Sequence, residues 1–161
     1  MKPGGAVGQL LLLLAVLTLD QGSKWWIEQQ PATLHIEVIP GVFNIIKAHN
    51  TGVAFSMLAD LPASWGRMLI LGVTIGIALA VALWWWHSRG RCEGWWLVLV
   101  LAGAIGNICD RLHLGYVVDF IQWFVVIDGR AYVWPAFNIA DSAISIAVAG
   151  LIIGGLRREG G

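Results

Sequence analysis

The sequence has few charged residues and few cysteines, and both shortages narrow the class of protein. Of its 161 residues only 12% are charged, while 58% are hydrophobic and the mean hydropathy is +0.74. A soluble domain carries about 25% charged residues, so the composition indicates a membrane protein. The formal net charge is zero. Without a basic surface to neutralise phosphates, nucleic acid is excluded as a partner.

Cysteine is the second shortage, with two residues in the whole chain. Cys92 stands in a short polar stretch and Cys109 in an apolar run, so neither a disulfide framework nor a cysteine-based zinc site is expected. Asp110 and His113 are spaced to place two metal ligands on one helical face, but no third or fourth ligand is evident. No metal site is predicted.

Long apolar runs dominate what remains. Four segments approach or exceed the roughly 17–25 residues that a helix needs to cross a bilayer: residues 8–26, 66–86, 95–112 and 137–156. All ten tryptophans fall near the ends of these segments, as in the aromatic belts of spanning bundles. We expect one integral membrane domain over residues 1–161, a four-transmembrane-helix bundle with outer loops at 27–65 and 113–136.

The first apolar segment also has features of a cleaved signal peptide, with Lys2 as its charged region. No small-x-small cleavage site follows it, and Asp20 and Lys24 lie near its end. We therefore expect a retained helix.

Orientation follows from the density of basic residues, because cytoplasmic segments are enriched in them. One side has its basic residues in very short segments: Lys2, Arg89, Arg91, Arg157 and Arg158. The other side has Lys47, Arg67 and Arg130, of which Lys47 and Arg130 are spread over long loops. This distribution predicts that both termini are cytoplasmic and that the long loops face outward.

Both outer loops have strand-like patterns. Leu34, Ile36 and Val38 alternate with polar residues, and after Pro40-Gly41 the run 42–47 is rich in β-branched and aromatic residues. Residues 116–127 and 131–134 are also strand-like and flank the hairpin signal Asp128-Gly129. These patterns predict a small extracytoplasmic β-sheet, a cradle whose apolar face lies on the bilayer or against the bundle.

Two aspartates beside apolar runs, Asp119 and Asp141, are the leading catalytic candidates. A carboxylate at a helix centre in a bilayer costs roughly 2.5–3.5 kcal/mol on insertion scales. With Asn138 as N-cap, Asp141 stands at the N3 position of a capping box, which explains this acid structurally. It does not explain why Asp119 lies on the same membrane face. Two neighbouring acids split their proton affinities and can activate a water, the chemistry of aspartic proteolysis.

Other polar residues near the predicted helix ends could support such a site. Asp20 and Lys24 are four residues apart, so they form a local ion pair, support a site between helices, or do both. Asp110 and Arg111 are adjacent and do not face each other on a helix. Asp110 and Arg111 are each expected to pair with another residue, and a structural ion-pair role is favoured for Asp110 over catalysis.

Glycines and asparagines also lie near the predicted site. Gly103 and Gly106 allow close helix approach, and Asn107 in an apolar helix readily bonds across helices. The segment 49–56 is expected to follow the second strand, where Asn50 and Gly52 suit a tight turn with positive φ. An asparagine there can also grip a substrate backbone in extended form.

Five motifs in order resemble the lipoprotein signal peptidase family, the bacterial type II signal peptidases. They are Asp20-Gln21-Gly22-Ser23-Lys24, Asn50-Thr51-Gly52-Val53-Ala54-Phe55, Gly106-Asn107-Ile108-Cys109-Asp110-Arg111, Val118-Asp119-Phe120-Ile121 and Phe137-Asn138-Ile139-Ala140-Asp141-Ser142. The resemblance implies that Asp119 and Asp141 form a catalytic dyad. It implies substrate-binding or supporting roles for Asp20, Lys24, Asn50, Gly52, Asn107, Arg111 and Asn138.

The resemblance also implies a substrate and a location. The substrate would be a diacylglyceryl-modified prolipoprotein, cleaved on the amino side of its lipidated cysteine at the outer face of the bacterial inner membrane. It implies contact with membrane lipids, inhibition by globomycin-type cyclic peptides and no metal or organic cofactor. We expect a monomer.

Two functions from other classes stay open on the sequence alone. A proton-coupled transporter would use Asp20, Lys24, Asp110 and Arg111 as relays, although the acids cluster at one end and no internal repeat is apparent. In a non-enzymatic assembly protein, all these charges would be structural ion pairs.

Overall fold

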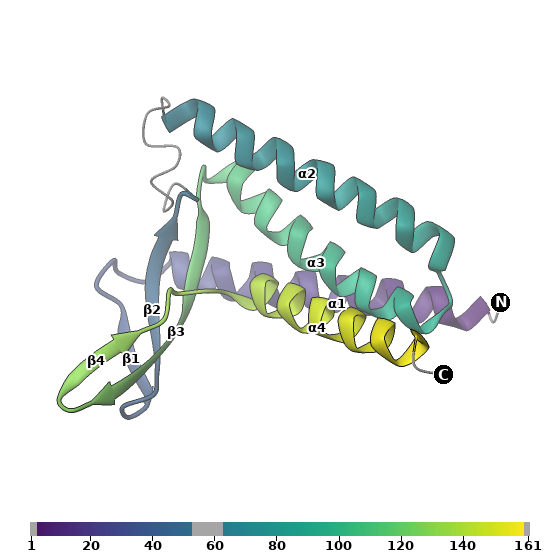
Figure 1. Ribbon diagram of the computed structural model, residues 1–161. Coiled ribbons are helices and arrows are strands. Elements are labelled where there is room, and N and C mark those ends of the chain that lie inside the picture. The colour runs from purple at the N-terminus through teal and green to yellow at the C-terminus, as the bar shows by residue number, and fades with distance from the viewer. Residues whose placement is uncertain (1–2, 53–62, 160–161) are drawn as a thin grey trace.

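Four long helices carry a four-stranded antiparallel sheet at one end (Figure 1). The computed structural model describes residues 3–52 and 63–159. In chain order the elements are α1 (Pro3–Glu28), β1 (His35–Ile39), β2 (Phe43–Asn50), α2 (Ala63–Ser88), α3 (Cys92–His113), β3 (Val117–Ile127), β4 (Arg130–Val133) and α4 (Ile139–Glu159). All four helices are long and apolar enough to cross a membrane, so the predicted fold class is confirmed.

Helices α1, α2 and α3 begin before the starts of the apolar segments predicted from the sequence, and α4 begins after the start of its segment. α1 starts at Pro3 rather than near residue 8, because helical hydrogen bonding continues through flanks that hydropathy does not recognise. α4 starts at Ile139 rather than at 137, because the backbone at Asn138 is the cap that precedes the first helical turn.

The central helix of the bundle is α3, which packs against α1, α2 and α4. About 56% of its spanning window is buried, whereas none of the α2 window is. Small residues allow α3 to pack closely against its neighbours. A Cβ on Gly103 would collide with the Ala140 carbonyl oxygen, and a Cβ on Gly106 would lie 2.5 Å from the Asp20 carboxylate. The predicted close helix approach at these glycines is confirmed.

The sheet has the order β1-β2-β3-β4. The turn between β3 and β4 has positive φ at both Asp128 (50°) and Gly129 (74°), which is the backbone of the predicted hairpin. Strand β2 continues through Asn50, which pairs with Val117. The expectation that His49 and Asn50 follow the strand was wrong, because ladder pairing with β3 extends the strand beyond its apolar residues. Residues 53–56 of that segment lie outside the described residues.

A small apolar cluster joins the sheet to the helices. Ile27 at the end of α1 packs with Val118 and Phe120 of β3, all nearly inaccessible to solvent. β3 also exchanges backbone hydrogen bonds with Phe137, just before α4. The first residues of β3 are therefore fixed to the end of the bundle.

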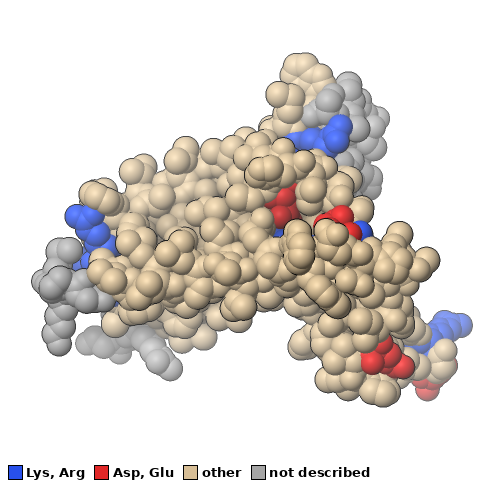
Figure 2. All heavy atoms as spheres, turned by 180° about the vertical axis from the view of Figure 1, so that it is seen from behind, with Lys and Arg blue, Asp and Glu red and all other residues tan. Residues whose placement is uncertain are grey.

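The two chain ends lie at the end of the bundle opposite to the sheet (Figure 1). The helical body presents an almost uncharged surface, and acidic side chains become visible near its junction with the sheet (Figure 2). The orientation prediction also rests on Lys2, Arg157 and Arg158, whose side chains lie outside the described part of the chain.

Replacing Gly106 by alanine is expected to destabilise the fold by about 1–3 kcal/mol, the usual cost of overpacking. The added methyl would meet the Asp20 carboxylate, which is buried and bonded on both oxygens. Gly72→Ala on α2 is the control, since a Cβ there meets nothing within 4 Å. Thermal unfolding in detergent should show a lower Tm for Gly106→Ala alone. Equal Tm values would contradict this account of α3 packing.

Candidate active site

A buried lysine lies where α1, α3 and α4 meet. The ammonium of Lys24 is 2.8 Å from Asp20 Oδ2, 3.0 Å from Asp110 Oδ2 and 2.9 Å from Asn107 Oδ1. Its three N–H donors therefore have three acceptors. Lys24, Asp20 and Asp110 are at most 4% exposed. The expected local ion pair between Asp20 and Lys24 is confirmed, and so is the structural ion-pair role of Asp110.

The two carboxylates of this cluster have further donors. Asp20 Oδ1 accepts a hydrogen bond of 2.8 Å from the backbone N–H of Ala140 in the first turn of α4, where the helix dipole favours negative charge. Asp110 Oδ2 accepts from the Val118 N–H at 3.1 Å, and its Oδ1 from Gln21 Nε2 at 3.0 Å. One positive and two negative charges are thus held in a dry site by backbone and amide dipoles.

Two asparagines connect this cluster to the candidate dyad. Asn107 accepts from Lys24 through Oδ1 and donates from Nδ2 to Asp141 Oδ1 at 2.8 Å. Asn138 donates from Nδ2 to Asp119 Oδ1 at 2.8 Å, while its Oδ1 accepts from the Asp141 N–H at 2.9 Å. Asn138 therefore contacts both aspartates, which come from a strand and a helix.

Asp119 is the more deeply buried of the two aspartates, at 2% exposure. Its Oδ2 accepts a 2.9 Å hydrogen bond from Asn50 Nδ2 on the neighbouring strand. Burial raises the pKa of Asp119 to about 6 and the nearby charge of Asp141 acts in the same direction, against the hydrogen bonds from Asn50 and Asn138 and the charge of Lys24. Near neutral pH this carboxyl is close to its titration point.

Asp141 has a different environment. It is half-buried at the first turn of α4, and its Oδ2 accepts from the Asn138 N–H at 3.4 Å. Together with the reciprocal bond from the Asp141 N–H, this is the predicted capping box. The carboxylate of Asp141 therefore lies at a helix N-terminus and accepts hydrogen bonds from Asn107 and Asn138. The two acids thus differ in burial and in hydrogen-bond partners.

The turn after β2 sets the position of Asn50. The Asn50 side-chain oxygen accepts from the Gly52 N–H at 2.9 Å while its Nδ2 donates to Asp119. Gly52 has a φ of +74°, and a Cβ there would lie 2.9 Å from Ile70 Cδ1 of α2. The positive φ favours glycine here, as the sequence predicted.

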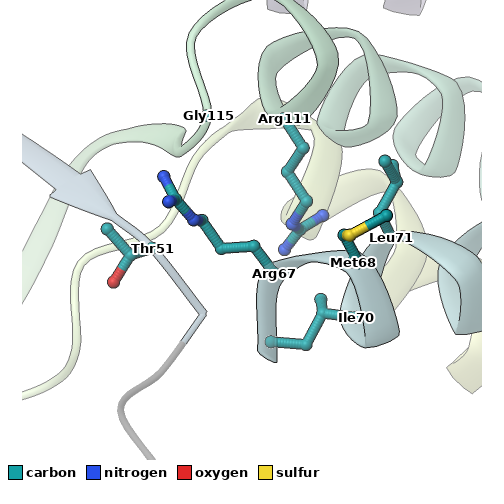
Figure 3. Close-up of a pocket in the computed structure, with 7 residues that line it drawn as sticks. All are labelled: Thr51, Arg67, Met68, Ile70, Leu71, Arg111 and Gly115. Atoms are coloured by element: carbon teal, nitrogen blue, oxygen red, sulfur yellow. The ribbon is translucent and has the colours of Figure 1, made fainter. Parts of the chain in front are cut away.

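Arg111 lies one helical turn after Asn107 on α3. Its Nη1 donates to the Asn107 carbonyl oxygen at 3.4 Å, and it interacts electrostatically with Asp141, Asp110 and Asp119. The Arg111 guanidinium points into a cavity between α2 and α3 (Figure 3). A second cavity, of about 460 Å³, is lined by Asp119 and Asn50 and opens beside the sheet.

The sequence-predicted site residues gather in one connected region. Asp20, Lys24, Asn107 and Asn138 are linked by hydrogen bonds to each other or to the two aspartates, and Asn50 reaches Asp119 from the sheet. Gln21 was missed. It bonds to Asp20, Asp110 and the Gly106 carbonyl, and its spacing from Lys24 on one helix face was the available signal.

This arrangement suits acid–base chemistry. It offers one carboxyl, Asp119, whose pKa is raised to about 6 and which lines a cavity, and a second carboxyl, Asp141, at the start of a helix. Within the described residues, no three or more His, Cys, Asp or Glu side chains gather as a metal site would.

Comparison with known proteins gives relatives from one family. The sequence profile of the family described as signal peptidase (SPase) II matches residues 12–157. The lipoprotein signal peptidase of Xanthomonas euvesicatoria is 40% identical over 158 residues, covering 94% of this chain and 87% of the relative. That of Xylella fastidiosa strain M12 is 41% identical over 147 residues, covering 88% and 84%.

Solved structures agree with these relatives. Two structures of a bacterial membrane enzyme, determined by the in meso method, each match with a TM-score of 0.77 and 32% identity. The first covers 93% of this chain and 88% of the solved chain, and the second covers 92% of both.

Replacing Lys24 by methionine is expected to destabilise the protein by about 3–5 kcal/mol, the usual cost of removing one partner of a buried ion pair. Two carboxylates would lose their shared cation at a site with almost no exposure. Adding Asp20→Asn to Lys24→Met should recover part of the loss because one uncompensated charge is removed. Arg130→Met on the exposed hairpin is the control. Denaturation in detergent measures all four proteins, and an unchanged midpoint for Lys24→Met would contradict the structural role of the cluster.

Proposed function

Because this chain belongs to the signal peptidase II family, we propose that it is an aspartic endopeptidase of the membrane with Asp119 and Asp141 as its dyad. Membership of this family supports the removal of signal peptides from lipoproteins as its activity. The dyad assignment depends on one observation above all others, that Asn138 donates to both carboxylates, from its side-chain Nδ2 to Asp119 and from its backbone N–H to Asp141. Two carboxylates held by one residue are positioned to share a single water.

The surroundings of the two acids suggest their roles. Asp141, at the first turn of α4, acts as the base that takes a proton from the water as it attacks the scissile carbonyl carbon. Asp119, whose pKa burial raises to about 6, acts in its protonated form, in which it donates a hydrogen bond to the carbonyl oxygen and stabilises the charge that develops there. Collapse of the tetrahedral intermediate breaks the C–N bond, and the amine leaves with the proton that Asp141 accepted.

The proposed substrate is a prolipoprotein whose cysteine carries diacylglyceryl, cut on the amino side of that cysteine. The polar site lies at the junction of an apolar bundle and a sheet (Figure 1), so both acyl chains and the signal helix can stay in lipid while the scissile bond reaches the site. We propose that both termini are cytoplasmic and that the site faces outward in a bacterial inner membrane. The enzyme would act as a monomer, and globomycin-type peptides would inhibit it.

A proton relay through the lysine cluster has less support. All three donors of Lys24 have acceptors, and Asp20 is bonded on both oxygens. A relay requires groups that can exchange partners along a path across the membrane. The cluster is instead a saturated local unit at one end of the bundle.

Asp119→Asn and Asp141→Asn should each lower kcat by about 10²–10⁴-fold, the range expected for loss of a general acid or base. Asparagine keeps the shape of the side chain, so the fold should persist. The measurement is cleavage of a purified diacylglyceryl-prolipoprotein in detergent micelles, with Asp128→Asn in the hairpin turn as control. Turnover near the wild-type rate by either folded variant would remove that aspartate from the dyad.

The pH profile tests the role of Asp119 independently. Since the proposed active form has Asp119 protonated and its pKa is raised to about 6, kcat/KM should fall as pH rises through about 6. The Asn50 hydrogen bond lowers this pKa, so Asn50→Ala should move the alkaline midpoint to higher pH. Asn44→Ala, on the same strand but bonded to Gln122, should leave the midpoint in place. A midpoint that moves down in Asn50→Ala would contradict the assignment.

A further inference from the structure

A cavity of about 260 Å³ lies between the turn after β2 and the facing sides of α2 and α3 (Figure 3). Its polar lining consists of Arg67 from α2, Arg111 from α3 and Thr51. Thr51 also lines the cavity that contains Asp119. The two cavities therefore adjoin at Thr51, so a group leaving the dyad has only a short way to travel into the arginine-lined space.

Charge is the first property of this arginine-lined cavity. The side chains of Arg67 and Arg111 come from different helices and both reach the cavity (Figure 3). Among its described lining residues there are two guanidiniums and no carboxylate. The guanidinium fork matches the two oxygens of a carboxylate. The cavity is therefore suited to an anion rather than to a neutral or cationic group.

The second property is an apolar wall beside the two arginines. Met68, Ile70 and Leu71 of α2 line the same cavity. Met68 is 71% exposed, and none of the spanning window of α2 is buried. Within the described residues, α2 packs mainly on α3. The remaining α2 surface is open to the lipid, where another apolar helix can lie alongside it.

The proposed reaction produces a ligand with both properties. Addition of water to the scissile peptide bond gives a carboxylate on the signal peptide and an ammonium on the lipidated cysteine. Before cleavage the same carbon carries a neutral carbonyl. The released signal peptide is thus an apolar helix that ends in a new negative charge at the level of the site.

We propose that the arginine-lined cavity is a product site, in which Arg67 and Arg111 bind the new C-terminal carboxylate of the cleaved signal peptide while its apolar residues pack on Met68, Ile70 and Leu71. The proposal rests on the proposed function for its ligand. Arg67 becomes a product-binding residue that discriminates the cleaved from the uncleaved chain. The uncleaved carbonyl lacks the charge that two guanidiniums recognise, so affinity rises only after the C–N bond breaks.

Binding of a synthetic signal peptide tests this site without turnover. The protein is placed in phosphatidylcholine nanodiscs, and affinity is measured for one peptide that ends in a free carboxylate and for the same peptide as a C-terminal carboxamide. We expect the carboxylate to bind about tenfold more tightly, which corresponds to about 1.4 kcal/mol. Arg67→Gln should reduce this preference to near unity, and Arg67→Lys should leave an intermediate value because it keeps the charge but loses the fork.

Arg130→Gln, on the exposed hairpin, is the matched control and should retain the full preference. Equal binding of carboxylate and carboxamide to the wild type would overturn the proposal, as would a full preference in folded Arg67→Gln. Equal weakening of both peptides by Arg67→Gln would also overturn it, since that pattern indicates packing alone. If phosphatidylglycerol displaces both peptides equally, the cavity binds a lipid phosphate and the proposal is wrong.

Kinetics separate this proposal from the proposed function. Product inhibition by the carboxylate peptide should weaken about tenfold in Arg67→Gln, with KM for the neutral substrate little changed. A wild-type protein that prefers the carboxylate peptide but does not cleave prolipoprotein would retain the site and refute the peptidase. A protein that cleaves without any carboxylate preference would retain the peptidase and refute the site.

Discussion

The ion pairs of Lys24 are the constraint on which the rest of this structure depends. One ammonium bonds to α1 through Asp20 and to α3 through Asp110 and Asn107, and Asp20 in turn bonds the first turn of α4. Removing charges from water costs several kcal/mol per ion, and only well-placed partners offset it. Because each partner comes from a defined helix, the cluster is satisfied in one relative arrangement of three helices. The cluster therefore specifies geometry more than it adds stability.

That geometry is transmitted to the two aspartates by asparagines rather than by further charges. An amide donates and accepts at once, so Asn107 bonds Lys24 on one side and Asp141 on the other. Asn138 does the same for Asp119 and the backbone of Asp141. These neutral connectors hold the acids in place without adding charge. Burial raises the pKa of Asp119 against the opposing effect of the hydrogen bonds from Asn50 and Asn138.

Two cavities meet beside this polar network and differ in character. One contains Asp119 and lies against the sheet, and the other contains two arginines above an apolar, lipid-facing wall of α2. In our proposal, the apolar signal helix lies beside α2 after cleavage, with its new carboxylate at the two arginines. The small residues of α3 let α1 and α4 pack closely against it beside these surfaces.

The sequence alone determined what depends on local pattern: four apolar helices, the Asp128-Gly129 hairpin, the capping box at Asn138 and the ion pair of Asp20 with Lys24. Spacing along the chain decides these features, because their partners are within a few residues. Tertiary structure decided the rest. Four features join residues from different elements: the hydrogen bond of Asn50 to Asp119, the extension of β2 through Asn50, the hydrogen bonds of Gln21, and the cavity that both Arg67 and Arg111 line. Helix packing and strand register set such distances, and neither can be read from the periodicity of one segment.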